Sequence, residues 1–392
     1  MIQQDQDTKS VMYITDRPPF SMVRGEGAWL WDNTGKRYLD FIQGWAVNCL
    51  GHSPKVVVDA IKEQAERLIN PSPAYFNEPM IELANLITKH SAFDQVFFTN
   101  CGAEANEGAI KLARKWGQLH RNGAYEIITM EHAFHGRTLA TMSASDKPNW
   151  RNLFEPKVDG FPHVPLNDLD AMKRAINDKT VGIMLEPVQG EAGVYPASDA
   201  YMQGLRRLAD ENGILLIVDE VQAGMGRTGR LFAHQWSGVE PDIMTLGKGI
   251  GGGVPLAALV AKDAVSCFAA GDQGGTYNGN PLVTAAGCAV MHELTAPGFM
   301  DRVNAMGKLL SERLADLSTE FSLGEVRGRG LLLALEMPGL NSKSVVKKCF
   351  DNGLLINGPR DNALRFMPAL NVSEAEIDTM IGMLRDVLLT EQ

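Results

Sequence analysis

A lysine set among glycines carries the clearest chemical signal in the sequence. Lys248 follows the apolar pair Ile243-Met244 and lies within a glycine-rich stretch from Gly247 to Gly253. Glycine lets the backbone approach a ligand closely, and a lysine partly removed from water has a lowered pKa and becomes a nucleophile toward carbonyls. The competing interpretation is a solvated lysine on a flexible loop. Apolar neighbours on both sides leave the two interpretations about equally weighted.

A carboxylate and an amide close a second apolar run. Asp219 follows five apolar residues, 214–218, and Gln222 comes three residues later. A buried carboxylate needs a cation or hydrogen-bond donors, so Asp219 is well placed to pair with a cationic ligand atom. A helix cap or a solvated loop acid is the equally weighted alternative. Gln222 could donate a hydrogen bond to a ligand oxygen.

Small residues follow a third run, 96–98, and lead into a helix that we expect to end near Trp116. Gly102 and Ala103 at its first turn leave backbone N–H groups open to an anion, and the helix dipole adds attraction. Taken alone, this pattern is more often an ordinary strand-to-helix turn.

Two other patterns point to different chemistry and are weaker. The glycines of 224–229 and 247–252 both match G-x-G-x-x-G, but arginines flank the first match and no clear helix starts within it. A dinucleotide-dependent dehydrogenase therefore stays a weak alternative. His132 and His135 lack the H-E-x-x-H spacing of zinc enzymes, so we expect no metal.

Apolar periodicity identifies the elements that must position these residues. Strand-length apolar runs recur, and helical spacing separates most of them; the runs are 96–98, 127–128, 181–185, 214–218 and 243–244. This alternation predicts an α/β fold with a mostly parallel sheet covered by helices on both faces. Ligands of such sheets bind outside the carboxyl ends of the strands, where Asp219 and Lys248 fall.

Three segments are expected along the chain. Residues 51–281 carry the alternating pattern and form a large domain. Residues 282–392 form a smaller α+β domain, and residues 1–50 form an N-terminal segment that packs with it. The last predicted helix runs from Glu374 to Leu389, with Ser373 and Glu376 as a capping box.

Composition excludes several classes of protein. The 392 residues are 45% hydrophobic and 21% charged, which is typical of a globular protein, and the net charge of −10 argues against binding to nucleic acid or anionic lipid. No apolar run reaches the ~18 residues of a membrane span, and the polar start Met1–Ser10 lacks a signal-peptide core. Five scattered cysteines favour a reduced compartment. We expect a soluble cytoplasmic protein.

Further motifs complete a recognisable set. In chain order the segments are NCGAEANE (100–107), FHGRT (134–138), EPVQGEAG (186–193), DEVQ (219–222), GRTG (226–229), TLGKG (245–249), GTYNGNP (275–281) and LRFMP (364–368). Each is a weak signal alone, but together they span nearly the whole chain. The set resembles the class III (ω-amino acid) aminotransferases, which are fold type I enzymes dependent on pyridoxal 5'-phosphate (PLP).

This resemblance implies a role for each motif residue. Lys248 holds the cofactor covalently and Asp219 pairs with its pyridinium nitrogen. Other cofactor contacts are Gly102 and Ala103 at the phosphate, Phe134 and Val221 on the two ring faces, Gln222 near the phenolic oxygen, and Thr276 at a phosphate across a homodimer interface. The substrate residues are Arg137 for an α-carboxylate, Arg365 for a 2-oxoglutarate carboxylate, and Glu191 as the gate that masks Arg365.

The chemistry of these side chains suits a ping-pong amino transfer. A lysine can hold a carbonyl cofactor reversibly and then carry a proton as a free amine. Two arginines with one switchable glutamate can serve an amine and a dicarboxylic keto acid in turn.

Within the family, the pattern most resembles members that transfer the δ-amino group of N-acetyl-L-ornithine to 2-oxoglutarate in arginine biosynthesis. N-succinylornithine, N-succinyl-diaminopimelate, ornithine and other ω-amines are the alternatives in this class, and a PLP aminomutase or decarboxylase is one outside it. Three residues depart from the family pattern: Cys101, where serine is common; Ala192, where glycine is usual; and Ala223, where serine or threonine is usual. They leave fine loop geometry open.

Overall fold

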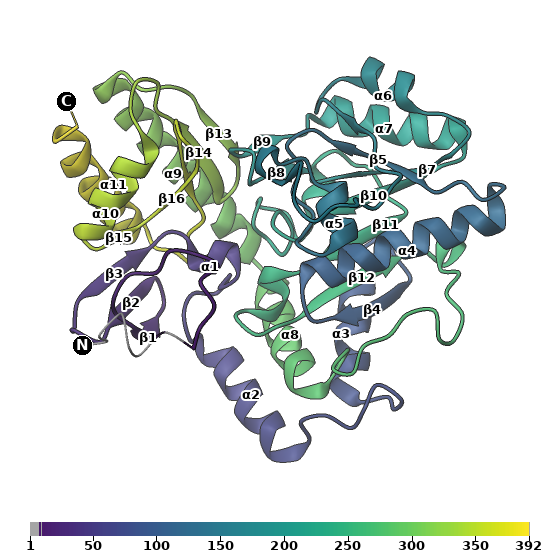
Figure 1. Ribbon diagram of the computed structural model, residues 1–392. Helices are drawn as coiled ribbons and strands as arrows, with labels where there is room; N and C mark the ends of the chain where they lie inside the picture. Colours follow the sequence, from purple (N-terminus) through teal and green to yellow (C-terminus); the bar gives the residue numbers. More distant parts are fainter. Residues whose placement is uncertain (1–7, 9, 392) are drawn as a thin grey trace.

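The computed structural model describes residue 8 and residues 10–391 (Figure 1). Most of the polar start Met1–Ser10 lies outside the described residues, so its interpretation stays a prediction. Within the part of the chain that is described, none of the helices combines the length and the apolar character that a membrane span requires.

A seven-stranded sheet forms the centre of the larger lobe (Figure 1). Its strands in spatial order are β4 (Gln95–Thr99), β12 (Ala257–Ala261), β11 (Ile243–Leu246), β10 (Leu215–Asp219), β7 (Thr180–Leu185), β5 (Glu126–Met130) and β6 (His163–Val164). β12 runs antiparallel to both neighbours, and the other pairs are parallel. The expected mostly parallel sheet is confirmed, although the sequence analysis did not identify β12.

Helices cover both faces of this sheet. Leu215 and Ile217 of β10 pack in the cluster that contains helix α4 (Gly102–His120), whereas Leu216 and Val218 pack in the cluster that contains helix α7 (Asp199–Asn212). Because successive side chains of a strand point to opposite faces, the two helices lie on opposite sides. The uniformly apolar strand therefore reflects burial on both faces.

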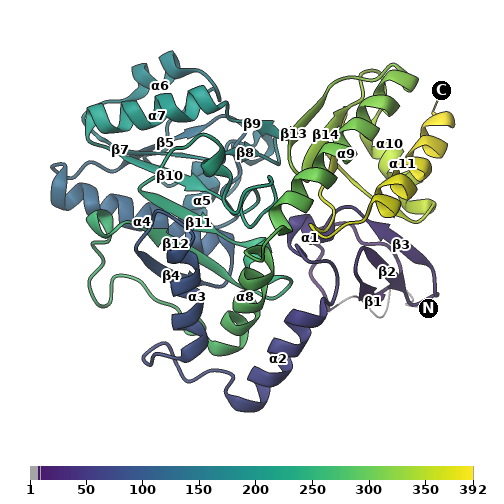
Figure 2. The same cartoon turned by 180° about the vertical axis from the view of Figure 1, so that it is seen from behind.

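A smaller lobe contains the C-terminal residues (Figure 2). Its antiparallel sheet has the order β13 (Val326–Arg329), β14 (Leu332–Glu336), β17 (Ala363–Phe366) and β16 (Asn357–Arg360). A second sheet joins β1 (Met22–Glu26), β2 (Trp29–Asp32) and β3 (Arg37–Asp40) to β15 (Leu354–Leu355), which pairs parallel with β3. N-terminal strands thus share a sheet with the C-terminal part, while the exact domain boundaries stay a prediction.

The remaining elements connect these sheets. The helices are α1 (Gln43–Ala46), α2 (Lys55–Arg67), α3 (Glu78–Lys89), α5 (Leu139–Ala144), α6 (Leu169–Ala175), α8 (Pro281–Leu294), α9 (Phe299–Phe321), α10 (Ser342–Asp351) and α11 (Glu374–Leu389), and β8 (Val188–Gln189) pairs with β9 (Tyr195–Pro196). Short 3-10 turns are η1 (Pro148–Trp150), η2 (Ala233–Trp236), η3 (Lys248–Gly251) and η4 (Asp263–Val265).

The capping box of α11 is confirmed: Glu376 N donates to Ser373 Oγ at 3.3 Å, and Ser373 N donates to Glu376 Oε2 at 2.8 Å.

Six of the seven strands of the large sheet end at the same edge, and five of them lead into motif residues. β4, β5, β7, β10 and β11 all run in the same direction, since β4 is related to β11 through two antiparallel pairings. The segments after these strands carry residues of the motifs that the sequence analysis quoted. They are Gly102 after β4, Phe134 after β5, Glu186 after β7, Asp219 at the end of β10 and Lys248 after β11.

Candidate active site

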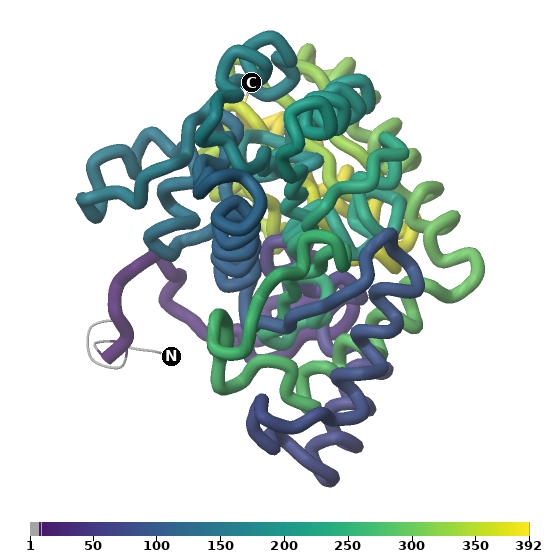
Figure 3. Tube along the Cα trace, turned by 90° about the vertical axis from the view of Figure 1, so that its right-hand side faces the viewer, coloured from purple at the N-terminus to yellow at the C-terminus, as the bar shows by residue number. Residues whose placement is uncertain are grey.

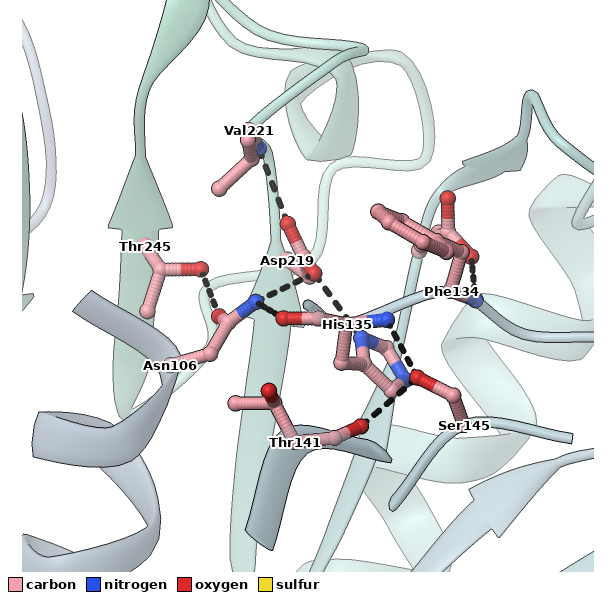
Figure 4. Close-up of polar contacts among 9 residues, drawn as sticks. Asn106, Phe134, His135, Thr141, Ser145, Asp219, Val221 and Thr245 are labelled. Atoms are coloured by element: carbon pink, nitrogen blue, oxygen red, sulfur yellow. Dashed lines mark hydrogen bonds and ion pairs between the residues drawn. The ribbon is translucent and has the colours of Figure 1, made fainter. Parts of the chain in front are cut away.

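Asp219 is buried at the end of β10, and three donors converge on its carboxylate (Figure 4). Oδ2 accepts hydrogen bonds from Asn106 Nδ2 and from His135 Nδ1, each at 2.8 Å, and Oδ1 accepts one from Val221 N at 3.0 Å. These bonds satisfy a charge that would be costly to bury alone. Burial by itself lowers the pKa of His135, but the hydrogen bond and charge of Asp219 outweigh it and raise this pKa.

Asn106, on helix α4, forms hydrogen bonds with three other segments of the site. Its Oδ1 accepts from Thr245 Oγ1 at 2.6 Å, and its Nδ2 also donates to the carbonyl of His135 at 2.7 Å (Figure 4). One side chain thereby fixes β11, β10 and the segment after β5. The sequence analysis missed the roles of Asn106 and His135, although both lie in its motifs, because nothing local shows that they meet Asp219.

Lys248 begins η3 directly after β11 and is half-buried. Its φ of +48° is unusual for a residue with a side chain, and such strain is typical of functional positions. Within the described chain, its Nζ has no hydrogen bond or ion pair. Burial lowers the pKa of Lys248, although the charges of Glu191, Asp219 and Glu186 oppose this shift. A lowered pKa enlarges the neutral, nucleophilic fraction of the amine.

The start of α4 forms a cradle of free backbone donors. Cys101 precedes the helix and provides no side-chain cap, and among residues 10–391 no acceptor pairs with the N–H groups of Gly102 and Ala103. A Cβ on Gly102 would lie 2.6 Å from Val221 Cγ1, and one on Gly247 would lie 3.0 Å from the same atom. Glycine is therefore required where the three segments meet, and the open donors suit a phosphate.

Arg365, on β17, reaches this site from the smaller lobe and is fully buried. Its Nη1 donates to Glu191 Oε1 at 2.8 Å and to Gln222 Oε1 at 3.2 Å, and its Nε donates to Asn357 Oδ1 at 3.1 Å. Its Nη2 is buried and has no partner in the described structure. An unsatisfied guanidinium nitrogen beside a displaceable carboxylate is suited to binding a second carboxylate.

Glu191 is ionised at physiological pH. Burial by itself raises the pKa of Glu191, but the charges of Arg365, Lys147 and Lys248 outweigh it and hold this pKa at about 2. About 23% of its side chain is exposed, so it can leave Arg365 toward solvent.

Two aromatic side chains, Phe134 and Trp150, lie next to each other, and Arg137 lies beside Trp150. The half-buried Phe134 lies 5.7 Å, between ring centroids, from Trp150, and Arg137 Cζ lies 5.3 Å from the Trp150 ring. Arg137 is exposed, and no carboxylate of the described chain pairs with its guanidinium. It is therefore available to a ligand.

Glu186 is buried next to Phe134. Phe134 N donates to its Oε1 at 2.9 Å, and burial raises the pKa of Glu186 to about 7. The sequence analysis quoted this residue in a motif but gave it no role.

Thr276 is the one candidate residue that the structure does not bring to a contact. It is exposed in the segment before α8, and its side chain makes no hydrogen bond within the described residues. The structure also places the three departures from the family pattern. Cys101 is exposed, Ala192 O accepts from Arg360 Nε at 2.9 Å, and Ala223 is buried.

Comparisons with known proteins show the family of this chain. The family model "Aminotransferase class-III" matches residues 13–388. The chain is similar to the acetylornithine aminotransferase of Ralstonia nicotianae (59% identical, covering 98% of each chain) and to acetylornithine aminotransferase 2 of Bordetella pertussis (60% identical, covering 97% of this chain and 96% of that one).

Solved structures show the same fold. The ornithine aminotransferase of Toxoplasma gondii ME49 matches with a TM-score of 0.93 and 31% identity, covering 98% of this chain and 93% of that one. The N-acetylornithine aminotransferase of Stenotrophomonas maltophilia K279a matches with a TM-score of 0.83 and 34% identity, covering 95% and 96%. The expected family and fold are confirmed: the chain belongs to the class III aminotransferases, whose cofactor is pyridoxal 5'-phosphate.

Proposed function

We propose that this aminotransferase moves the δ-amino group of N-acetyl-L-ornithine to 2-oxoglutarate, giving N-acetyl-L-glutamate 5-semialdehyde and L-glutamate, a step of arginine biosynthesis. Relatives named acetylornithine aminotransferase, between 44% and 60% identical over most of the chain, support this substrate. The observation that carries the proposal is the ion pair of Arg365 with Glu191 beside the unpartnered Nη2 of Arg365.

This ion pair can serve two substrates in turn. While Glu191 holds Arg365, the charges of these two side chains cancel. The site then accepts an amine whose reacting end carries no carboxylate. When Glu191 leaves, Nη1 and Nη2 together offer the planar fork that binds a carboxylate through two hydrogen bonds. The unpaired guanidinium of Arg137 would hold the α-carboxylate of the amine.

The residues present also fit the cofactor. Lys248 would hold PLP covalently, Asp219 its ring nitrogen, and the free N–H groups of Gly102 and Ala103 its phosphate. The ring contacts would come from Phe134, Val221 and the amide nitrogen of Gln222, whose oxygen is already engaged by Arg365. When bound, PLP supplies an electron sink for the bond-breaking step. Asp219 stabilises positive charge at the ring nitrogen, and Lys248 Nζ accepts the proton that leaves the substrate carbon.

We further propose a homodimer in the cytoplasm, with Thr276 completing the phosphate site of the partner subunit. The neighbouring Tyr277 is exposed, as are Tyr75 and Phe76. Ahead of β1, the purple segment in Figure 3 projects from the body and exposes residues 11–14. Large exposed apolar side chains of this kind are typical of surfaces that another subunit covers. In each subunit, residues 51–281 would form the large domain and residues 282–392 with 1–50 the small one.

Ornithine is the second candidate amine, because the ornithine aminotransferase of Toxoplasma gondii aligns at a TM-score of 0.93. The test is a set of kcat/KM values for N-acetylornithine, ornithine, N-succinylornithine and N-succinyl-diaminopimelate, with 2-oxoglutarate as acceptor. We expect N-acetylornithine to react with the highest kcat/KM and to give one glutamate per semialdehyde. A higher kcat/KM for another amine would identify that amine as the substrate in place of N-acetylornithine. Loss of the amine without glutamate formation would instead indicate an aminomutase or a decarboxylase.

A further inference from the structure

We propose that Lys147 is a second counter-charge for Glu191, which receives the Glu191 carboxylate when a dicarboxylic keto acid takes Arg365. This inference rests on the proposed function, because it assumes that the distal carboxylate of the acceptor binds Arg365.

The two oxygens of Glu191 face two different cations. Oε1 lies 2.8 Å from Arg365 Nη1, whereas Oε2 lies 3.6 Å from Lys147 Nζ. The first distance is a hydrogen bond, and the second is too long for one. Glu191 therefore forms a hydrogen bond with Arg365 and only a longer ion pair with Lys147. Lys147 can form a hydrogen bond with this carboxylate once the carboxylate moves toward it.

Lys147 is held in a way that leaves its donors available. Its Nζ lies 4.5 Å from the ring centroid of Phe134 and 5.4 Å from that of Trp150. Such cation–π contacts hold a charge without occupying its N–H groups. The ammonium makes no hydrogen bond within the described chain, and its side chain is 28% exposed. The long side chain can thus follow Glu191 over a short distance.

Glu191 needs such a partner because it is charged when it leaves Arg365. Burial by itself raises the pKa of Glu191, and the charge of Arg365 is the first of the causes that hold this pKa at about 2, so the loss of Arg365 removes the main support of the buried charge. A half-buried carboxylate that loses its arginine partner without a replacement would raise the free energy of the open gate. The hydrogen bond that Lys147 gains on opening lowers the free energy of the open gate, so that less of the binding energy of the dicarboxylate is needed to shift the equilibrium toward this state.

A direct role for Lys147 in binding substrate is the main alternative. Arg137 Cζ lies 5.3 Å from the centroid of the same Trp150 ring, so Lys147 and Arg137 are both close to this ring. Either could contact a substrate carboxylate, and the experiment must separate this role from action through Glu191.

The experiment compares Lys147→Gln and Lys147→Arg in the PLP-loaded enzyme. It measures the Kd of glutarate, a dicarboxylate without a reactive carbonyl, by titration calorimetry, and the KM of each substrate in separate half-reactions. For Lys147→Gln we expect glutarate and 2-oxoglutarate to bind about tenfold more weakly, which corresponds to ~1.4 kcal/mol. The KM of the amine should change by less than about twofold. Lys147→Arg should stay close to wild type. Unchanged glutarate binding in Lys147→Gln would overturn the proposal.

A matched control tests for loop disorder. Lys157 Nζ donates to the carbonyl of Trp150 at 2.8 Å but makes no contact with Glu191. Lys157→Gln perturbs the same segment and should leave glutarate binding unchanged. If it weakened glutarate as much as Lys147→Gln does, the effect would come from the loop, and the proposal would fail.

Two further backgrounds identify the route of action. In Glu191→Ala, adding Lys147→Gln should have no further effect on glutarate, because Lys147 then has no carboxylate to receive. A persistent tenfold loss would show that Lys147 binds the dicarboxylate directly, and the proposal would be wrong. Arg365→Ala tests the underlying function separately: if it leaves glutarate binding intact, the assumed carboxylate site itself is wrong, whatever Lys147 does.

Discussion

His135 Nδ1 lies 2.8 Å from Asp219 Oδ2, and both side chains are buried beneath the carboxyl ends of the central strands. The raised pKa of His135 favours its protonated form, which stabilises the negative charge of Asp219. Asn106 supplies a second donor to the same oxygen at 2.8 Å. The carboxylate is thus fixed in orientation before any ligand arrives.

Asp219→Asn should keep the shape of this site and remove its charge. Because a neutral amide cannot hold a protonated ring nitrogen, we expect kcat to fall by ~10²-fold or more and PLP to bind more weakly. Single-turnover kinetics and cofactor titration measure the two effects. Asn106→Ala, which removes a donor but keeps the charge, is the control and should have the smaller effect. A wild-type kcat in Asp219→Asn would exclude the assigned role.

Arg137→Lys should raise the KM of the amine substrate. Lysine keeps the charge but lacks the planar fork of a guanidinium. We expect kcat/KM to fall by a factor that corresponds to about 2–5 kcal/mol of lost transition-state binding free energy. Arg151 also lies next to Trp150 in the chain but pairs with Asp146, at 3.6 Å. Arg151→Lys should therefore leave kcat/KM near wild type. Equal effects of the two substitutions would contradict a specific carboxylate contact.

Gly102→Ala should weaken PLP binding. The new Cβ would lie 2.6 Å from Val221 Cγ1, so either the start of α4 or Val221 must shift, at a cost of about 1–3 kcal/mol. Both are expected to contact the cofactor. The control is Gly382→Ala in helix α11, because a Cβ at Gly382 meets nothing within 4 Å. Spectroscopic titration of PLP into the cofactor-free proteins measures the difference, which we expect only for Gly102→Ala.

Glu186→Gln should change the pH dependence of stability. The folded-state pKa of Glu186 is raised from 4.5 to about 7, so the folded protein binds this proton more tightly than the unfolded chain. Its contribution to stability is therefore present below pH 4.5 and is lost as the pH rises to about 7. Glutamine keeps an acceptor for Phe134 N without ionising.

Melting temperatures of the cofactor-free proteins between about pH 5 and 8 provide the measurement. We expect Glu186→Gln to gain stability over wild type as the pH rises. The exposed Glu211, changed to glutamine, is the control and should run parallel to wild type. A constant difference between Glu186→Gln and wild type would contradict the raised pKa.

Much of the fold followed from local patterns. The buried runs behind Asp219 and Lys248 predicted strands with ligand-facing ends, because apolar residues on both faces require a sheet covered by helices. The capping box that joins Ser373 to Glu376 spans only four consecutive residues, so the sequence alone could identify it. β12 was missed although it is entirely buried, since its apolar residues follow a glycine-rich stretch without a clear boundary.

The sequence by itself determined which side chains end the strands and which family motifs they form. Only the tertiary structure decided which of them meet. Asn106 contacts Asp219 from 113 residues away, Arg365 reaches Glu191 across 174, and Lys147 approaches the second oxygen of the same glutamate. These contacts depend on the order of strands in the sheet and on the placement of the smaller lobe. Both are set by packing between distant segments, which no local pattern encodes.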